Sequence, residues 1–150
     1  MRLQWSIEGE VQLSRKLIGL SNNLKDYTRP FSDSATYLKG IFSRDVFQTQ
    51  GRAIGETWKR LSPATVSAKA RRGDPAEPLI TSRAVMQNSF YTIVSSDQAV
   101  IGNRAAYFKY HQSNAPRARI PRRVMMKIAS AQRAEIVRFF QQYIHESIRK

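Results

Sequence analysis

The 150-residue chain contains no cysteine, which excludes a disulfide framework and thiolate metal sites and fits synthesis in a reducing cytosol. The two histidines, His111 and His145, are far apart in the sequence, and no histidine or carboxylate cluster has the spacing of metal ligands. We therefore expect a fold held together by packing, with no metal and no cofactor.

Long apolar runs are also missing. The first eight residues contain no apolar stretch of signal-peptide length, and no run is long enough to cross a bilayer. We therefore expect a soluble protein without a membrane partner. The length fits one domain, and 41% hydrophobic residues with 10% aromatic residues are sufficient for a core.

Acidic residues are scarce, and their scarcity is uneven. The chain has 25 Lys and Arg against 11 Asp and Glu, a net charge of +14. Residues 98–150 hold eleven of the basic residues and two of the acidic ones. Such asymmetry is typical of a surface that meets nucleic acid, an anionic membrane or an acidic protein, and a solvated face that only aids solubility is the alternative.

Two short basic segments, residues 69–72 and 114–123, form the predicted contact surface. The loop 114–123 contains arginine and no lysine, which suits bidentate pairing with carboxylates or phosphates. We expect this surface to face an acidic partner or DNA, although Arg123, beside an apolar run, is also a candidate anchor to the subunit's own body. The predicted contact residues are Lys69, Arg71, Arg72, Arg117, Arg119, Arg122 and Arg123.

Apolar periodicity organises the first part of the chain, about residues 2–50. The segment Leu3–Ile7 alternates apolar and polar residues and predicts a strand, and leucines at helical spacing predict a helix over about 10–24. From Pro30 to Val46 the apolar residues again share one helical face, with Gly40 as a weak point.

The central part, about residues 51–128, is rich in turns. Ser62 and Pro63 predict the start of a short helix that ends near Gly73, because serine caps free N–H groups and proline is tolerated in the first turn. The prolines in 74–78 predict a loop, and a second short helix is expected over 82–89.

Two strand-like runs, 91–94 and 99–101, predict a hairpin. Beyond it we expect a helical turn or two over 105–112, an exposed basic loop over 113–119 and another strand over 124–128.

The clearest helix comes last, over about residues 130–149, and its apolar stripe predicts a buried face. The predicted fold class is α+β, with long helices packed on a small antiparallel sheet in a single domain. The stripe consists of Ile136, Phe139, Phe140, Tyr143, Ile144 and Ile148.

No residue pattern indicates catalysis. Acidic residues are scattered singly, no serine lies in a recognised nucleophile motif, and Gly51 and Gly55 lack the lysine of a phosphate-binding loop. We therefore expect a protein that is not an enzyme. The aromatic residues Tyr107, Phe108 and Tyr110 resemble base-stacking residues, but we favour two of the three rings in the core.

The order of several short motifs indicates a family. They are Trp58–Leu61, Ser62–Thr65, Lys69, Leu79–Ser82, Ser89, Val100–Gly102, Tyr107, His111–Gln112, Ile120–Pro121 and Arg123. In this order they resemble the phage virion morphogenesis family, the Mu-like and P2-like tail completion proteins. Ser82, Ser113–Asn114 and Val124–Met126 depart from the family's usual residues.

The resemblance implies a structural role in the virion, with assembly in the host cytoplasm. It implies a homo-oligomeric ring in the tail or neck, for which six-fold symmetry is one option, in contact with other tail and head-connector proteins or packaged DNA. The motif residues that it marks as structural are Trp58, Leu61, Thr65, Tyr107, His111, Gln112 and Pro121.

The competing hypothesis is a basic nucleic-acid-binding module with no role in a virion. It explains the charge and the mixture of aromatic and basic residues, but it does not explain the ordered motifs. An enzyme is the third class, and the sequence supplies no candidate residues for it.

Overall fold

The axis of the molecule is a long helical segment that begins with α2, Thr28–Gly40. The computed structural model describes residues 22, 24–114 and 119–149. α2 continues into a π-helical turn, η1 (Ile41–Asp45), and then into the short α3 (Val46–Gln48). Gly40 is the last residue of α2, so the predicted weak point coincides with a change of helix type.

The π-helical turn brings two neighbouring residues into the core. The Val46 N–H donates to the Ile41 carbonyl, one residue further back than in an α-helix. Val46 and Phe47 are both fully buried, together with Phe42 one turn earlier. The apolar face predicted for this segment is therefore confirmed.

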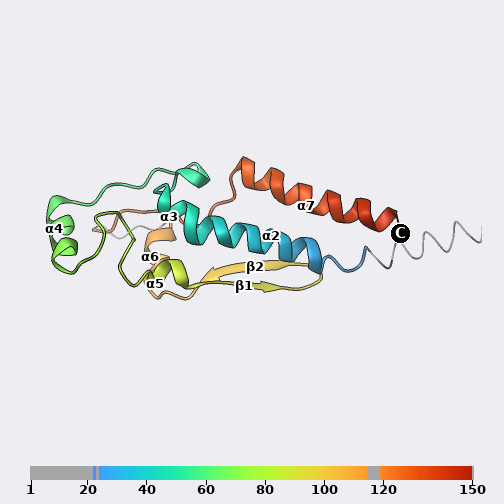
Figure 1. Ribbon diagram of the computed structural model, residues 1–150, viewed down its shortest axis with the longest axis horizontal. Helices are drawn as coiled ribbons and strands as arrows, with labels where there is room; N and C mark the ends of the chain where they lie inside the picture. Colours follow the sequence, from blue (N-terminus) through green and yellow to red (C-terminus); the bar gives the residue numbers. More distant parts are fainter. Residues whose placement is uncertain (1–21, 23, 115–118, 150) are drawn as a thin grey trace, which may run out of the picture.

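The helical axis is the middle of three layers, because α2 lies between α7 (Ser130–Ile148) and a β-hairpin (Figure 1). α7 runs antiparallel to α2: Tyr27 stacks against Phe140 with ring centroids 5.9 Å apart, and Tyr37 meets Phe139 edge to face, also at 5.9 Å. The hydroxyl of Tyr143 donates to the Asp26 carbonyl at 2.6 Å and ties the end of α7 to the start of α2.

The hairpin consists of β1 (Phe90–Val94) and β2 (Ala99–Asn103), which pair antiparallel with Val94 opposite Ala99 next to the turn. It lies where the sequence predicts it. On its outer face the Tyr91 ring covers Gly102, where a Cβ would come within 2.4 Å of the ring, so a larger residue at position 102 would displace the tyrosine.

Short helices fill the end of the molecule away from the hairpin turn (Figure 1). α4 begins as predicted, because Ser62 Oγ accepts a hydrogen bond from the Thr65 N–H. The helix expected over 82–89 is shorter than predicted, since Ala84 has a left-handed backbone with φ of 47°. These helices are η2 (Arg52–Ile54), α4 (Pro63–Arg71), α5 (Val85–Asn88) and α6 (Phe108–Gln112).

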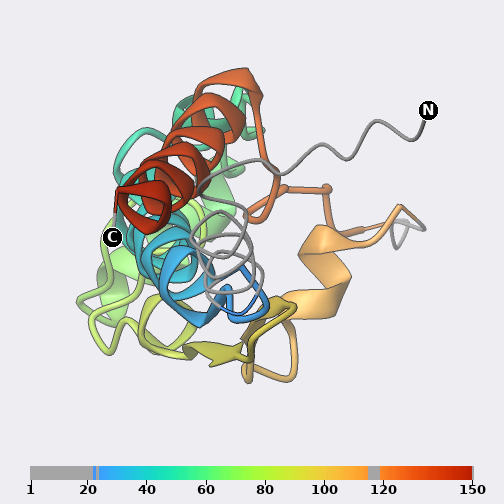
Figure 2. The same ribbon diagram turned by 90° about the vertical axis from the view of Figure 1, so that its right-hand side faces the viewer.

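Figure 2 shows the segment that contains α6 standing to one side of the helices. The main core lies between this segment and the long axis. Its buried members include Leu38, Phe42, Val46, Phe47, Ile54, Trp58, Met86, Phe90, Val124 and Met125. The fold is α+β, with helices packed on a small antiparallel sheet, and the predicted fold class is confirmed.

Two expectations are wrong, and a third concerns residues that the structure does not describe. Residues 124–128 form no strand, although Val124 and Met125 are buried. The apolar stripe of α7 is half-buried rather than buried, and Ile148 is 60% exposed, because α2 covers one side of this helix. The strand and helix expected before residue 22 lie outside the described residues.

Candidate functional site

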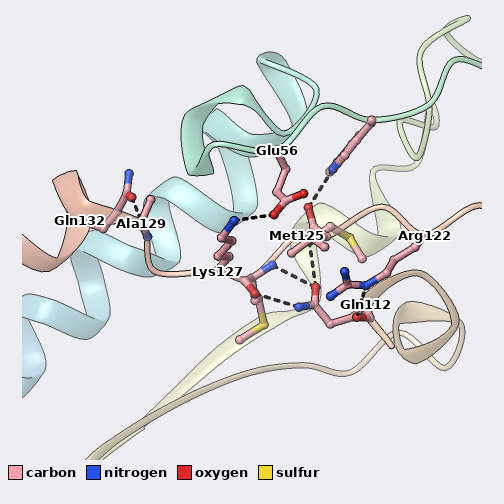
Figure 3. Close-up of polar contacts among 10 residues, drawn as sticks. Glu56, Gln112, Arg122, Met125, Lys127, Ala129 and Gln132 are labelled. Atoms are coloured by element: carbon pink, nitrogen blue, oxygen red, sulfur yellow. Dashed lines mark hydrogen bonds and ion pairs between the residues drawn. The ribbon is translucent and has the colours of Figure 1, made fainter. Parts of the chain in front are cut away.

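The motif residues meet around residues 120–129, which we call the clamped segment. It has no regular secondary structure after Ile120. Gln112 holds it from α6: its Nε2 donates to the Met126 carbonyl at 2.8 Å, and its Oε1 accepts from the N–H groups of Met125 and Met126 at 2.9 and 3.1 Å (Figure 3). One side-chain amide thus takes the place of a neighbouring strand.

Trp58 fixes the clamped segment from the opposite side. Its indole Nε1 donates to the Val124 carbonyl at 2.8 Å, and its ring lies edge to face with Phe47 at 5.5 Å. Gly51 makes room for this ring, because a Cβ at that position would lie 2.8 Å from the indole. Gly51 also has φ of 92°, a conformation that favours glycine. Trp58 is therefore a core residue.

Arg123 is an internal anchor, and its assignment to the contact surface needs correction. It is 4% exposed, and its Nε and Nη2 donate to the Lys59 carbonyl at 3.0 and 2.8 Å. Its backbone N–H donates to the His111 carbonyl at 3.0 Å. Burial lowers the pKa of Arg123 from its ordinary high value. The guanidinium holds the subunit's own backbone, as the alternative from the sequence foresaw.

His111 lies against this anchor. Burial lowers the pKa of His111, the charge of Arg123 lowers it further, and a hydrogen bond to the Pro121 backbone acts in the opposite direction. The Nδ1 atom is buried and has no hydrogen-bond partner among the residues that the structure describes. These surroundings favour the neutral imidazole, which leaves the positive charge at this point to Arg123.

Lys69 also needs correction as a contact residue. It is 6% exposed, and its ammonium donates to the carbonyls of Glu77 and Ile80, each at 2.6 Å. Burial lowers the pKa of Lys69, while the charges of Asp74 and Glu77 raise it. Lys69 therefore closes the loop behind α4 instead of presenting a charge to a partner.

Asp74 completes this loop. Its Oδ1 accepts hydrogen bonds from the backbone N–H and the hydroxyl of Ser82, at 2.9 and 3.0 Å. These bonds lower the pKa of Asp74, and Arg72 lies 3.7 Å from its other oxygen. Ser82 does not have a positive φ, so its place in this turn does not require glycine.

The remaining predicted contact residues are exposed. Arg122 lies beside the buried Arg123, and its Nε is 3.4 Å from the Gln112 carbonyl. Arg119 is exposed in the same segment, and Arg71 and Arg72 are exposed at the end of α4. Arg117 lies outside the described residues. Of the predicted contact arginines that the structure describes, Arg123 is therefore an internal anchor and the others lie on the surface.

The other motif residues differ in how far they are exposed to solvent. Leu61 is half-buried, Thr65 is exposed in the first turn of α4, and Pro121 is half-buried in the clamped segment. Tyr107 is 41% exposed, while Phe108 packs against the core, so of the two, Phe108 is the core residue.

Sequence reasoning missed three features near the site. Gln132 is buried, donates from Nε2 to the Ala53 carbonyl at 3.0 Å and accepts from the Ala129 N–H at 3.2 Å. A glutamine three residues after the start of a helix is a capping signal that could have identified this contact. Lys127 pairs with Glu56 at 2.6 Å (Figure 3).

The third missed feature is a cavity of about 410 Å³ between α4 and the core. Trp58, Leu61, Val66 and Pro78 line it with apolar surface, and Arg52 lies among its other lining residues. Among residues 22, 24–114 and 119–149, no group of histidine and carboxylate residues could hold a metal, and no helix is long and apolar enough to cross a membrane.

A family model for the phage virion morphogenesis family matches residues 10–145. The chain belongs to the phage virion morphogenesis family. No curated protein and no solved structure matches it. The membership agrees with the resemblance drawn from the ordered motifs.

As a member of this family, the chain is associated with the phage virion. The family is a structural family of virion morphogenesis. The clamp residues Trp58, Gln112 and Arg123 agree with such a role, because each holds the chain's own backbone.

Proposed function

We propose that the protein is a structural component at the head-proximal end of a phage tail. Copies form a ring that completes the tail and joins it to the head connector. The observation that supports this role most is the clamp. Gln112, Trp58 and Arg123 direct their polar groups to the subunit's own backbone, so the motif residues build a rigid surface and not a reaction site.

The clamped segment can hold exposed arginine side chains on a rigid backbone. Arg123 is anchored on the Lys59 carbonyl, while its neighbour Arg122 is exposed. Because Arg123 and Gln112 hold the backbone of this segment, the side chains of Arg122 and Arg119 project into solvent from fixed positions. Guanidinium groups so placed suit carboxylates of neighbouring tail or connector proteins, or phosphates at the end of packaged DNA.

Loss of the protein should block assembly at the joining step. In particles made without it, electron microscopy should show heads and tails that fail to join, or tails of abnormal length. Purified wild-type protein should form a ring in sedimentation experiments. Normal infectious particles from the deletion would contradict the proposed role.

Charge reversal tests the basic surface separately from the fold. Arg119→Glu with Arg122→Glu should leave the free energy of unfolding nearly unchanged, because exposed charges contribute little to stability. The same pair should prevent joining, since like charges then meet across the contact. Arg83→Glu with Arg133→Glu is the charge-matched control on exposed arginines elsewhere. Equal joining by both double variants would show that the surface is an ordinary solvated face.

A nucleic-acid-binding module is the second candidate, and one observation favours it. Lys59, Arg60 and Arg71 are exposed, and none of them has an ion-pair partner among the described residues. Duplex DNA binding by such a surface should weaken steeply as salt rises, because counterions are released on binding. A steep salt slope with normal particles from the deletion would favour this candidate over a tail role.

A further inference from the structure

An apolar slot runs beside β2. Ala99 and Ile101 of β2 line it, together with Leu38 and Phe42 of α2 and residues 126–128 of the clamped segment. Its volume is about 320 Å³. Ligand cavities in proteins begin at about this size, near 300 Å³.

Among residues 22, 24–114 and 119–149, no backbone group pairs with the edge of β2 that faces this slot. Next to the turn, the Ser95 N–H donates to the Gln98 carbonyl at 2.9 Å. Hydrogen-bonded pairs alternate along an antiparallel ladder. The register therefore turns the backbone groups of Ala99 and Ile101 away from β1 and toward the outer edge.

The clamped segment does not occupy this edge. In the described part of the chain, no backbone hydrogen bond joins β2 to residues 126–128. Gln112 already holds the backbone of Met126, through both its N–H and its carbonyl. The slot therefore has hydrogen-bonding groups on one wall, and its other walls are apolar except for Lys127, which pairs with Glu56. A strand edge beside pockets for alternate side chains meets the requirements for accepting an added strand.

The edge also lacks the usual protection against strand addition. Natural edge strands carry charged residues, proline or bulges that prevent pairing with another chain. β1 and β2 contain no Lys, Arg, Asp, Glu or Pro. In a chain of net charge +14, this uncharged edge is a place where a second copy can approach without repulsion.

We propose that the slot receives residues 2–8 of a second copy of this chain, the N-terminal arm, as a strand added to β2. This inference rests on the proposed ring. Residues 1–21 lie outside the described part of the structure, so the arm is identified by its sequence. Leu3, Trp5 and Ile7 fall on one side of a strand and suit the apolar walls, while the polar residues between them fall on the other side.

Reach favours a neighbour as the source of the arm. Residues 2–8 hold Arg2 and Glu8 and so have no net side-chain charge, which adds no repulsion toward a basic neighbour. The chain joins the fold beside the hairpin turn, where the Tyr27 N–H donates to the Ser96 carbonyl at 3.0 Å. The helix predicted over 10–24 would add about 22 Å between this point and the arm.

An arm from one copy in the slot of the next is a contact between two different surfaces. Contacts of this kind close into rings when the rotation between subunits is suitable. The arm and the slot would therefore supply the repeated contact of the ring, and the exposed arginines would be left to other partners.

Matched substitutions in the full-length chain test the arm and the slot. Trp5→Asp with Ile7→Asp should abolish the ring in sedimentation and light-scattering measurements, because charge enters the apolar slot. Gln4→Asp with Ser6→Asp adds the same charge to the other side of the arm and should keep the ring. In the slot, Ala99→Asp should abolish the ring, while Val100→Asp, on the outer face of β2, should keep it.

Cross-linking gives a second test that leaves the apolar residues of the arm unchanged. The chain has no cysteine, so any disulfide must join introduced residues. Ser6→Cys in one chain and Val100→Cys, on the outer face of β2, in a second chain of different tagged mass should form a mixed disulfide under mild oxidation. Ser67→Cys, exposed on α4, replaces Val100→Cys in the control and should not form it.

The outcomes separate this inference from the proposed function. A ring that persists in all four aspartate variants would overturn the inference and leave the tail role intact. A disulfide that forms only within a chain carrying both Ser6→Cys and Val100→Cys would place the arm in its own slot and would also overturn it. A wild-type protein that stays monomeric at all concentrations would overturn both.

Discussion

The two ends of this molecule are held together in different ways. Along the α2–α7 seam, apolar stripes meet through ring contacts such as Phe31 with Phe140, whose centroids are 5.0 Å apart. At the clamped segment, the backbone is irregular and individual side chains such as Gln112 and Trp58 satisfy it. A striped seam distributes its stability over many similar contacts, whereas a clamp depends on single residues.

The largest loss of stability should come from the core beneath the clamp. Phe47 is fully buried and contacts both Trp58 and Phe90 through its ring. Phe47→Ala should lower the free energy of unfolding by about 3–5 kcal/mol, because it leaves a cavity that the surrounding rings cannot fill. Chemical denaturation measures this change. A loss below about 1 kcal/mol would mean that the core collapses around the gap.

Gln112→Glu should cause the next largest loss of stability, although it only replaces the side-chain NH₂ group by an oxygen atom. A carboxylate cannot donate to the Met126 carbonyl, so one buried contact becomes repulsive, at a cost of about 2–3 kcal/mol near neutral pH. A protonated carboxyl group can donate again, so the loss should shrink as the pH falls. Denaturation of the variant at pH 7 and pH 5 tests both statements, and an unchanged midpoint would show that the clamp is dispensable.

Phe140→Ala on the helical seam should cost less than Phe47→Ala. Phe140 is half-buried, so the expected loss is about 1–2 kcal/mol, below the value for a fully enclosed ring. The two variants measured side by side by denaturation give the comparison directly. Equal losses would mean that α7 is covered more completely in solution, for example by a second copy.

The smallest effect should be a pH dependence at His111. Burial and the charge of Arg123 lower the pKa of His111, so the folded state binds a proton less readily than the unfolded state. The stabilisation is therefore complete above the unfolded pKa, about 6.5, and is lost as the pH falls below it. His111→Asn should flatten the decline in unfolding free energy between pH 7.5 and pH 5.5. Parallel curves for the two proteins would contradict this assignment.

The periodic and turn-forming parts of the fold could be predicted from the sequence. The face from Pro30 to Val46, the hairpin and the Ser62 cap each depend on neighbours within a few residues. The segment 124–128 was wrongly predicted as a strand because a short apolar run is compatible with several structures. Its backbone partners come from Gln112 and Trp58, which are distant in the sequence.

The candidate site was less predictable, because burial decides the role of each basic residue. Arg122 and Arg123 are adjacent and chemically identical, yet one is exposed and the other is anchored on the Lys59 carbonyl. Lys69 belongs to a basic run, but its ammonium points inward to two carbonyls. Composition indicates where charge is concentrated, whereas tertiary structure determines which of the charges reach a partner.

The π-helical turn Ile41–Asp45 has a consequence for how this protein can change by insertion and deletion. A turn of this kind holds one residue more than an α-helical turn, so the helix itself would tolerate the loss of one residue here. A deletion that converts this turn into a regular α-helical turn would leave the residues that follow close to their present rotation about the helix axis, whereas a deletion in the regular part of α2 would rotate them by about 100° and shift them by about 1.5 Å. Val46 and Phe47 would then stay in the core and Phe47 would keep its ring contact with Trp58, so we expect lineages to tolerate the loss of one residue here more readily than in the rest of α2.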